Sequence, residues 1–317
     1  MSGTYSGDQA YKYIFDPVFY RLSNIEKSVI KQTFTPVAGV GDSMSFQRIK
    51  QDTKHVKKTD LNEVVKPNNA THDRFWLFHD TYYDNITLDK ESVRRMAQDP
   101  ASEYFQILMG SAMRIQDEVA LDAFFATVTF GKLGTDTTSG TFPAANYVAK
   151  AFSGGAFGQT GSQLTIDKLL EVKKKASAKR VKYGRSAPFF VLVREKDIQD
   201  MLANKIGTDN FPIIHQDFVE SYNLSKTQQP SEFGDSFMWN DFVFIKVPDE
   251  YLPTDSSGDT LIPVYQKQGM LFGTWINVES DVVRLPNTLE SMDIRVLTDV
   301  GAVRRDPDKV YGVTVTT

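Results

Sequence analysis

Ser43 is the residue whose type and setting most readily suggest chemistry. It stands in the block Gly-Asp-Ser-Met-Ser at 41–45, where its hydroxyl could act as a nucleophile. A nucleophilic serine needs a histidine to accept its proton and a carboxylate to orient that histidine. The chain has four histidines, so the position of each along the sequence tests this chemistry.

The block at 41–45 resembles the nucleophile motif of the GDSL-type serine hydrolases. In that family the base and its carboxylate lie near the C-terminus, as Asp-x-x-His. Here the last histidine is His215, and no later residue can supply the base. The segment before the motif, 37–40, is a weak strand at best. We therefore expect a protein that is not an enzyme, and keep a serine hydrolase only as an alternative.

Phosphate and metal sites are not indicated either. The glycine-rich stretch 154–161 lacks the Lys-Ser/Thr ending that grips phosphate and magnesium. Gly39 and Gly41 lack the third glycine and the helix of a dinucleotide-binding loop. The histidines show no i,i+4 pairing on a helix, as a metal site on a helix would require. No cofactor and no metal are expected.

One cluster of basic residues exceeds the background. The segment 168–185 holds eight basic residues against one acidic residue, Glu171. It coincides with a predicted helix that Thr165 caps and that runs to about Lys182. Because one side of this helix is apolar, its other faces must carry polar residues. A solvated face is therefore one interpretation; contact with packaged DNA or with an acidic patch of another subunit is the other. The candidate residues are Lys173, Lys174, Lys175, Lys179 and Arg180.

Composition indicates a globular chain of about two domains. The 317 residues are 41% hydrophobic, with 36 basic and 40 acidic side chains and a net charge of −4, which does not mark a dedicated nucleic-acid or membrane-surface protein. There is no cysteine, so stability must come from packing and association. No stretch approaches the ~18 apolar residues of a membrane helix, and we expect a soluble intracellular product.

The first eighty residues predict an arm and a projecting hairpin. Residues 1–40 are rich in aromatic side chains with weak periodicity, and the arm lies either on its own domain or on a neighbouring subunit. Strand-like alternation over 43–49 and 75–78 encloses a long charged excursion, which is either a solvated loop or a binding loop. Candidate subunit-contact residues are Phe15, Tyr20, Lys54, His55, Lys57 and Lys58.

The remaining elements mix helices and strands without regular alternation, which favours an α+β fold. The clearest helix spans about 101–126: Asp99 can cap it, Pro100 fits its first position, and Leu108, Ile115 and Val119 recur at helical spacing. Further helices are expected at about 90–97 and 195–203. A buried strand is expected at 188–193, others at 242–247, 262–266, 270–278 and 282–285, and a loop with at most short strands at 131–161. Residues 292–317 read as strand, polar turn and strand, which predicts a closing β-hairpin.

This order of elements resembles the Hong Kong 97-type fold of major capsid proteins of tailed double-stranded DNA phages. The matching pieces are Tyr-Tyr-Asp-Asn-Ile-Thr-Leu-Asp at 82–89, Asp-Pro-x-x-x-Tyr at 99–104, and Gly-Ala-Val-Arg-Arg-Asp-Pro at 301–307. The resemblance implies a division of the chain into four parts. These are an N-terminal arm (1–40), an E-loop hairpin (41–80), a peripheral domain with the spine helix (81–164 and 286–317), and an axial domain (165–285).

The resemblance also implies a function. The subunit would self-assemble as pentamers and hexamers into an icosahedral shell around phage DNA, without a membrane, and the shell would form in the host cytoplasm. Portal, scaffolding or decoration proteins would be further partners. An encapsulin-like compartment, which shares the fold and holds an enzyme cargo, is the alternative within the same fold.

Overall fold

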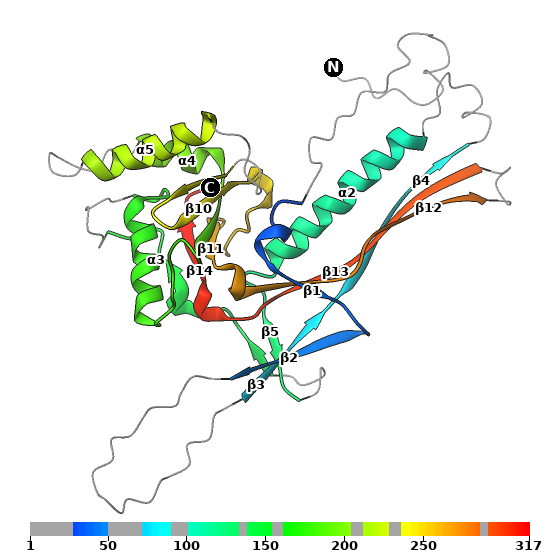
Figure 1. Ribbon diagram of the computed structural model, residues 1–317, viewed down its shortest axis with the longest axis horizontal. Helices are drawn as coiled ribbons and strands as arrows, with labels where there is room; N and C mark the ends of the chain where they lie inside the picture. Colours follow the sequence, from blue (N-terminus) through cyan, green and yellow to red (C-terminus); the bar gives the residue numbers. More distant parts are fainter. Residues whose placement is uncertain are drawn as a thin grey trace, which may run out of the picture.

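The computed structural model describes residues 28–49, 72–89, 101–132, 138–153, 161–203, 212–227, 236–285 and 291–317. These residues form three sheets and four α-helices (Figure 1). A long sheet carries one helix, a six-stranded sheet carries the other three, and a small sheet contains the strands β2 and β3 of the predicted hairpin. The α+β class predicted from the sequence is confirmed.

The long sheet is the frame of the molecule. Its order is β1-β12-β13-β4, and all neighbours run antiparallel except β1, which lies parallel to β12. Its strands are β1 (Thr35–Ala38), β4 (Asp80–Leu88), β12 (Met270–Leu285) and β13 (Ser291–Arg304). The β12–β13 hairpin replaces the two separate short strands expected over 270–285. A register shift between Thr274 and Glu279 interrupts its otherwise regular pairing.

Helix α2 (Ala101–Asp122) lies along one face of this sheet (Figure 1). Leu108 and Ala112 are buried there against Ile294 and Val296 of β13. The helix ends at Asp122, four residues earlier than the sequence suggested, and the chain turns there through a hydrogen bond from the Phe124 amide to the Leu121 carbonyl. Its capping residues and the short helix expected at 90–97 lie outside the described residues.

The six-stranded sheet contains most of the buried core. Its order is β7-β14-β11-β8-β10-β9, and every residue of β8 is buried, as the apolar run at 188–193 predicts. The strands are β7 (Tyr147–Val148), β8 (Phe189–Val193), β9 (Ser236–Trp239), β10 (Phe242–Lys246), β11 (Thr260–Tyr265) and β14 (Val310–Val315). The accompanying helices are α3 (Ile166–Ala178), α4 (Glu195–Ala203) and α5 (Pro212–Thr227). Thr165 caps α3 as expected, accepting a hydrogen bond from the Lys168 amide.

The small sheet has the order β2-β3-β5-β6, and its strands β2 and β3 are the described base of the predicted hairpin (Figure 1). Its strands are β2 (Ser43–Ile49), β3 (His72–Phe78), β5 (Val128–Phe130) and β6 (Thr138–Gly140). β2 and β3 pair antiparallel from Ser43 opposite Phe78 to Ile49 opposite His72. The antiparallel pair predicted at this point is therefore confirmed, while its tip lies outside the described residues.

The C-terminal stretch does not close as a hairpin, so this prediction is wrong. β13 pairs with β12 and β4 in the long sheet, whereas β14 pairs with β11 and β7 in the six-stranded sheet. A short 3-10 turn at Pro307–Lys309 carries the chain from one sheet to the other. The apolar alternation located both strands, but alternation reports burial and not the pairing partner.

The expected domain boundary at 285 and 286 does not match the sheets. It separates β12 from β13, although the two strands pair along nearly their whole length. It also places β14 with α2, although β14 lies inside the six-stranded sheet. The assignment of the six-stranded unit as axial, and of the long sheet with α2 as peripheral, stays a prediction.

Candidate functional site

The base of the projecting hairpin has one buried face and one outward face. Phe75 and Leu77 are buried, and Phe46 stacks on Phe75 with ring centroids 5.5 Å apart. On the other face, Phe78 is 47% exposed and Ile49 is 63% exposed. Exposed apolar side chains on a projecting element are typical of a surface that another subunit covers. The candidate contact residues Lys54, His55, Lys57 and Lys58 lie outside the described residues.

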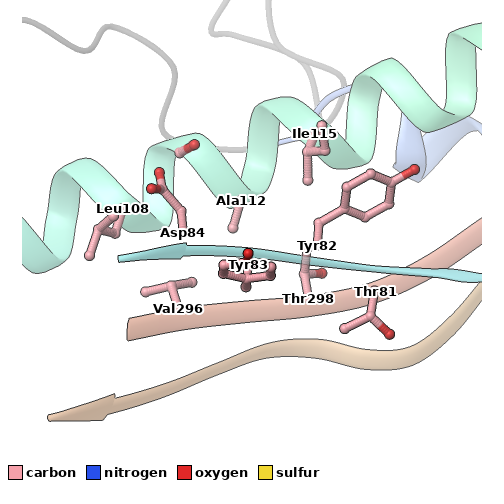
Figure 2. A pocket seen from close by; sticks show the side chains of 10 residues that line it. Thr81, Tyr82, Tyr83, Asp84, Leu108, Ala112, Ile115, Val296 and Thr298 are labelled. Atoms are coloured by element: carbon pink, nitrogen blue, oxygen red, sulfur yellow. The ribbon is translucent and has the colours of Figure 1, made fainter. Parts of the chain in front are cut away.

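A groove runs between α2 and β4 on the helix-bearing face of the long sheet (Figure 2). It has a volume of about 430 Å³. Leu108, Ala112 and Ile115 line it from the helix, and Val296 and Thr298 line it from the sheet. Tyr83 beside it is 79% exposed. Ile115, expected from its spacing to be a core residue, is only half-buried because it borders this groove.

A buried polar clasp holds the start of the described chain against α2. The Asp117 carboxylate accepts hydrogen bonds from Ser28 Oγ at 2.5 Å and from the Ile30 amide at 3.2 Å. Burial raises the pKa of Asp117, and these hydrogen bonds oppose the rise. Lys31 Nζ donates to the side-chain oxygens of Gln116 at 3.1 Å and Asn277 at 2.5 Å. Residues 1–27, with the candidates Phe15 and Tyr20, lie outside the described residues.

No local pattern in the sequence predicts this clasp, because charged helix residues ordinarily face water. Asp117 is nevertheless only 3% exposed, and the neighbouring Gln116 is fully buried. Both residues turn toward the segment that leads into β1, which approaches α2 from a distant part of the chain. The clasp thereby holds residues 28–31 against the C-terminal half of α2.

Most of the basic cluster on α3 binds within the subunit. Lys173 Nζ contacts Asp241 at 3.0 Å. Lys175 Nζ donates to the Tyr147 carbonyl at 2.6 Å, and Lys179 Nζ contacts Asp308 at 2.7 Å. Lys174 is 77% exposed and pairs only with Glu171, one turn away on the same helix.

Arg180, the fifth member of the cluster, is exposed in a left-handed conformation just after α3. Lys174 and Arg180 are thus the two members with side chains open to solvent. The role of the cluster in contacting DNA or another subunit stays a prediction that now depends mainly on these two residues.

The geometry around Ser43 does not assemble a catalytic triad. His79 Nδ1 lies 2.5 Å from Asp299 Oδ1, so a histidine–carboxylate pair does exist near the motif. Ser43 is paired directly across from Phe78, the residue before His79. Cross-strand partners share a face and successive residues alternate, so Ser43 points away from the His79 side. The sequence argument placed no base after His215 and did not consider His79, which comes near through the β2–β3 pairing.

The described part of the chain shows no further chemical site. Within it, no group of three or more histidine, aspartate or glutamate side chains could hold a metal ion. Among the same residues, no helix is long and apolar enough to cross a membrane.

Comparison with known proteins identifies the family. The model of a phage capsid protein family matches residues 9–317. The chain belongs to this phage capsid protein family. The prediction of a phage major capsid protein, a structural component of the virion, is thereby confirmed. Comparison with curated proteins gave no match.

Solved phage capsids share the fold over the full length of this capsid protein. The capsid of Ralstonia phage GP4 is 11% identical with a TM-score of 0.69, covering 100% of this chain and 98% of that chain. The capsid of cyanophage Pam1 is 9% identical with a TM-score of 0.66, covering 100% and 99%. The mature capsid of bacteriophage PhiM1 is 12% identical with a TM-score of 0.58, covering 95% and 88%. The Hong Kong 97-type fold expected from the sequence agrees with these likenesses.

Proposed function

We propose that this capsid protein assembles with copies of itself, as pentamers and hexamers, into a closed icosahedral shell around phage DNA. The observation that carries the proposal is the family match from residue 9 to residue 317, since it covers the arm and the hairpin as well as the core. The solved neighbours include a capsid asymmetric unit, which is a set of copies within a shell. Contacts of about 800 Å² per partner, repeated around each subunit, can hold such a shell.

Two surfaces support the proposal. The hairpin base carries exposed Ile49 and Phe78, and the groove beside α2 is lined by apolar side chains together with the exposed Tyr83. Each of them presents apolar or aromatic groups that one subunit leaves uncovered. Contacts between copies of the chain would bury these groups.

Electron microscopy of the purified protein tests the proposal. We expect closed shells tens of nanometres across, alone or with co-expressed scaffolding protein. Particles isolated from infected host cells should contain this chain and nuclease-protected double-stranded DNA. A protein that stays monomeric under both conditions would contradict self-assembly, and shells that hold an enzyme cargo without nucleic acid would favour the encapsulin-like alternative.

An ester-hydrolysis assay tests the remaining alternative. We expect the wild-type protein to turn over simple aryl esters no faster than buffer, and Ser43→Ala to assemble normally. The reason is that Ser43 faces away from the His79–Asp299 pair. Turnover that exceeds the buffer rate and disappears in Ser43→Ala would revive the hydrolase interpretation.

Partners and location follow from the same proposal. The shell would meet a portal at one vertex, and scaffolding or decoration proteins during or after assembly in the host cytoplasm. The exposed cations Lys174 and Arg180 are the members of the α3 cluster that could touch DNA phosphates or an acidic patch of a neighbour. Proteomic analysis of purified virions, with cross-linking at Lys174, would distinguish these partners.

A further inference from the structure

Trp275 of β12 lies where the projecting hairpin joins the long sheet. Its indole Nε1 donates a hydrogen bond of 2.6 Å to the main-chain carbonyl of Gly41, in the turn that leads into β2. The ring fills the space beside Gly39 and Gly273, because a Cβ atom added at either glycine would overlap it. The turn at Gly39–Gly41, which leads into β2, is therefore held directly against β12.

His79 holds the exit strand at the same place. It is the single residue between β3 and β4, and its ring stacks on Trp275 with centroids 4.3 Å apart and an interplanar angle of 25°. Its Nδ1 donates to Asp299 of β13 at 2.5 Å, in a pair whose side chains are 20% and 11% exposed. A Cβ atom at Gly301 would overlap the Phe78 carbonyl, so the end of β3 lies directly on β13.

We propose that Trp275, His79 and Asp299, with the Gly41 carbonyl, form a latch that fixes the direction in which the β2–β3 hairpin leaves the subunit. These are positioning residues for assembly, and this role rests on the proposed function, in which the hairpin contacts a neighbouring copy. The linkers give little slack, since four residues join β1 to β2 and one joins β3 to β4. A small change in the angle between the β2–β3 pair and the long sheet would therefore displace the far end of the hairpin by a large distance.

The latch supplies direction, which apolar packing alone does not. Below the hairpin, Leu77 packs with Leu271 of β12 and Val303 of β13 in a small apolar cluster. Apolar burial is non-directional and tolerates rocking, whereas hydrogen bonds and ring stacking depend on angle. The cluster therefore attaches the hairpin to the sheet, and the latch selects one orientation.

Hydrogen exchange of the unassembled, full-length subunit tests the latch, with Trp275→Phe as the main variant. This change removes the donor to Gly41 and keeps a ring for His79 to stack on. Trp76→Phe is the matched control, because Trp76 of β3 also donates its indole N–H to a glycine carbonyl at 3.1 Å, but the acceptor is Gly131 after β5, which is not part of the latch. A lost hydrogen bond of ordinary strength corresponds to a change of about fivefold to tenfold in a local opening equilibrium.

We expect Trp275→Phe to speed exchange about fivefold to tenfold in peptides covering 39–46 and 75–80, with a melting temperature near that of the wild type. Trp76→Phe should leave exchange at 39–42 unchanged. Equal exchange in Trp275→Phe and wild type, or the same acceleration at 39–42 in Trp76→Phe, would overturn the proposal.

Two substitutions at His79 keep the test informative if Trp275→Phe folds poorly. His79→Asn retains a donor for Asp299 and should keep slow exchange at 75–80, while His79→Phe retains the ring but removes the donor and should speed it. Identical behaviour of the two would overturn the role of the His79–Asp299 pair.

Assembly provides the second readout. We expect latch variants that remain folded to give misshapen or mixed-size particles where the wild type gives uniform shells. Uniform shells from Trp275→Phe would overturn the positioning role. A wild-type protein that forms no shell at all would instead contradict the proposed function, while the exchange measurement on the free subunit still decides whether the latch exists.

Discussion

Lys168 is a charged side chain that is fully buried and hydrogen-bonded inside the subunit. It lies in the first turn of α3, and its amine donates to the main-chain carbonyls of Gln163 at 2.8 Å and Thr314 at 3.2 Å. It thereby ties the loop before α3 to the C-terminal strand β14. Burial, together with the nearby cation of Lys150, lowers the pKa of Lys168 to about 8.

The lowered pKa of Lys168 predicts a pH-dependent stability. Between about pH 8 and the ordinary lysine pKa near 10.4, the unfolded chain binds more protons than the folded chain, so this group makes the free energy of unfolding rise with pH. Lys168→Met removes the titration. We expect the difference in unfolding free energy, wild type minus variant, to grow between pH 7.5 and 9.5, by no more than about 1.4 kcal/mol per pH unit.

Urea unfolding at pH 7.5, 8.5 and 9.5 measures this difference. Lys174→Met is the control, since it makes the same substitution on the same helix at a lysine whose side chain is 77% exposed. A flat profile for Lys168→Met would show that the amine has no unusual environment.

At the residue scale, the sequence located the basic cluster but not its partners. Thr165 as the cap of α3 follows from local chemistry, because the cap binds an amide three residues away. The partners of Lys175 and Lys179, in contrast, come from 28 and 129 residues away. Patterns within one segment carry no information about such distant partners. Lysines that the sequence predicts to face solvent can therefore be bound by other parts of the same subunit.

At the scale of elements, α2 offers a direct test of its packing. Leu108 is 1% exposed against β13, while the adjacent Ile107 is 39% exposed. We expect Leu108→Ala to lower the free energy of unfolding by about 2–5 kcal/mol, because it deletes buried methyl groups and leaves a cavity. Ile107→Ala should change it by about 0.5 kcal/mol or less. Thermal and urea unfolding of the two variants provide the measurement, and equal losses would mean that the helix is rotated.

Elements with strong periodicity or caps were predictable, and those without were not. The bounds of β2 and α4 match the sequence expectation because apolar alternation and helical spacing are clear there. The sequence predicts no strand at β4, because its residues are mostly exposed on both faces and show no apolar alternation. α5 and β9 were missed as well. They pack on each other through Phe218, Phe237 and Trp239, a contact that single-segment patterns do not reveal.

At the scale of the whole molecule, the hairpin should be separable from the fold. We expect a chain in which residues 50–69 are replaced by a short Gly-Ser turn to fold normally and to fail in assembly. Ile49 and His72 are paired across the two strands, so a short turn can join them without strain. Circular dichroism and thermal melting report the fold, and electron microscopy reports the shells.

A milder variant serves as the control for this deletion. Changing Lys54, His55, Lys57 and Lys58 to serine keeps the length of the hairpin and removes its charge. Normal shells from the shortened chain would contradict the assembly role of the hairpin, whereas a loss of assembly in both variants would locate the contact in those four side chains.

The position of β14 also has a consequence for synthesis in the cell. Although it follows the other described strands in the sequence, it lies inside the six-stranded sheet, between β7 and β11. The ribosome makes residues 310–315 after those strands, so β11 keeps an open edge until they emerge. Pairing across such long sequence separations is also slow. A nascent chain therefore cannot complete this sheet before Val315 is made, and chains that terminate before residue 310 lack a strand from its interior.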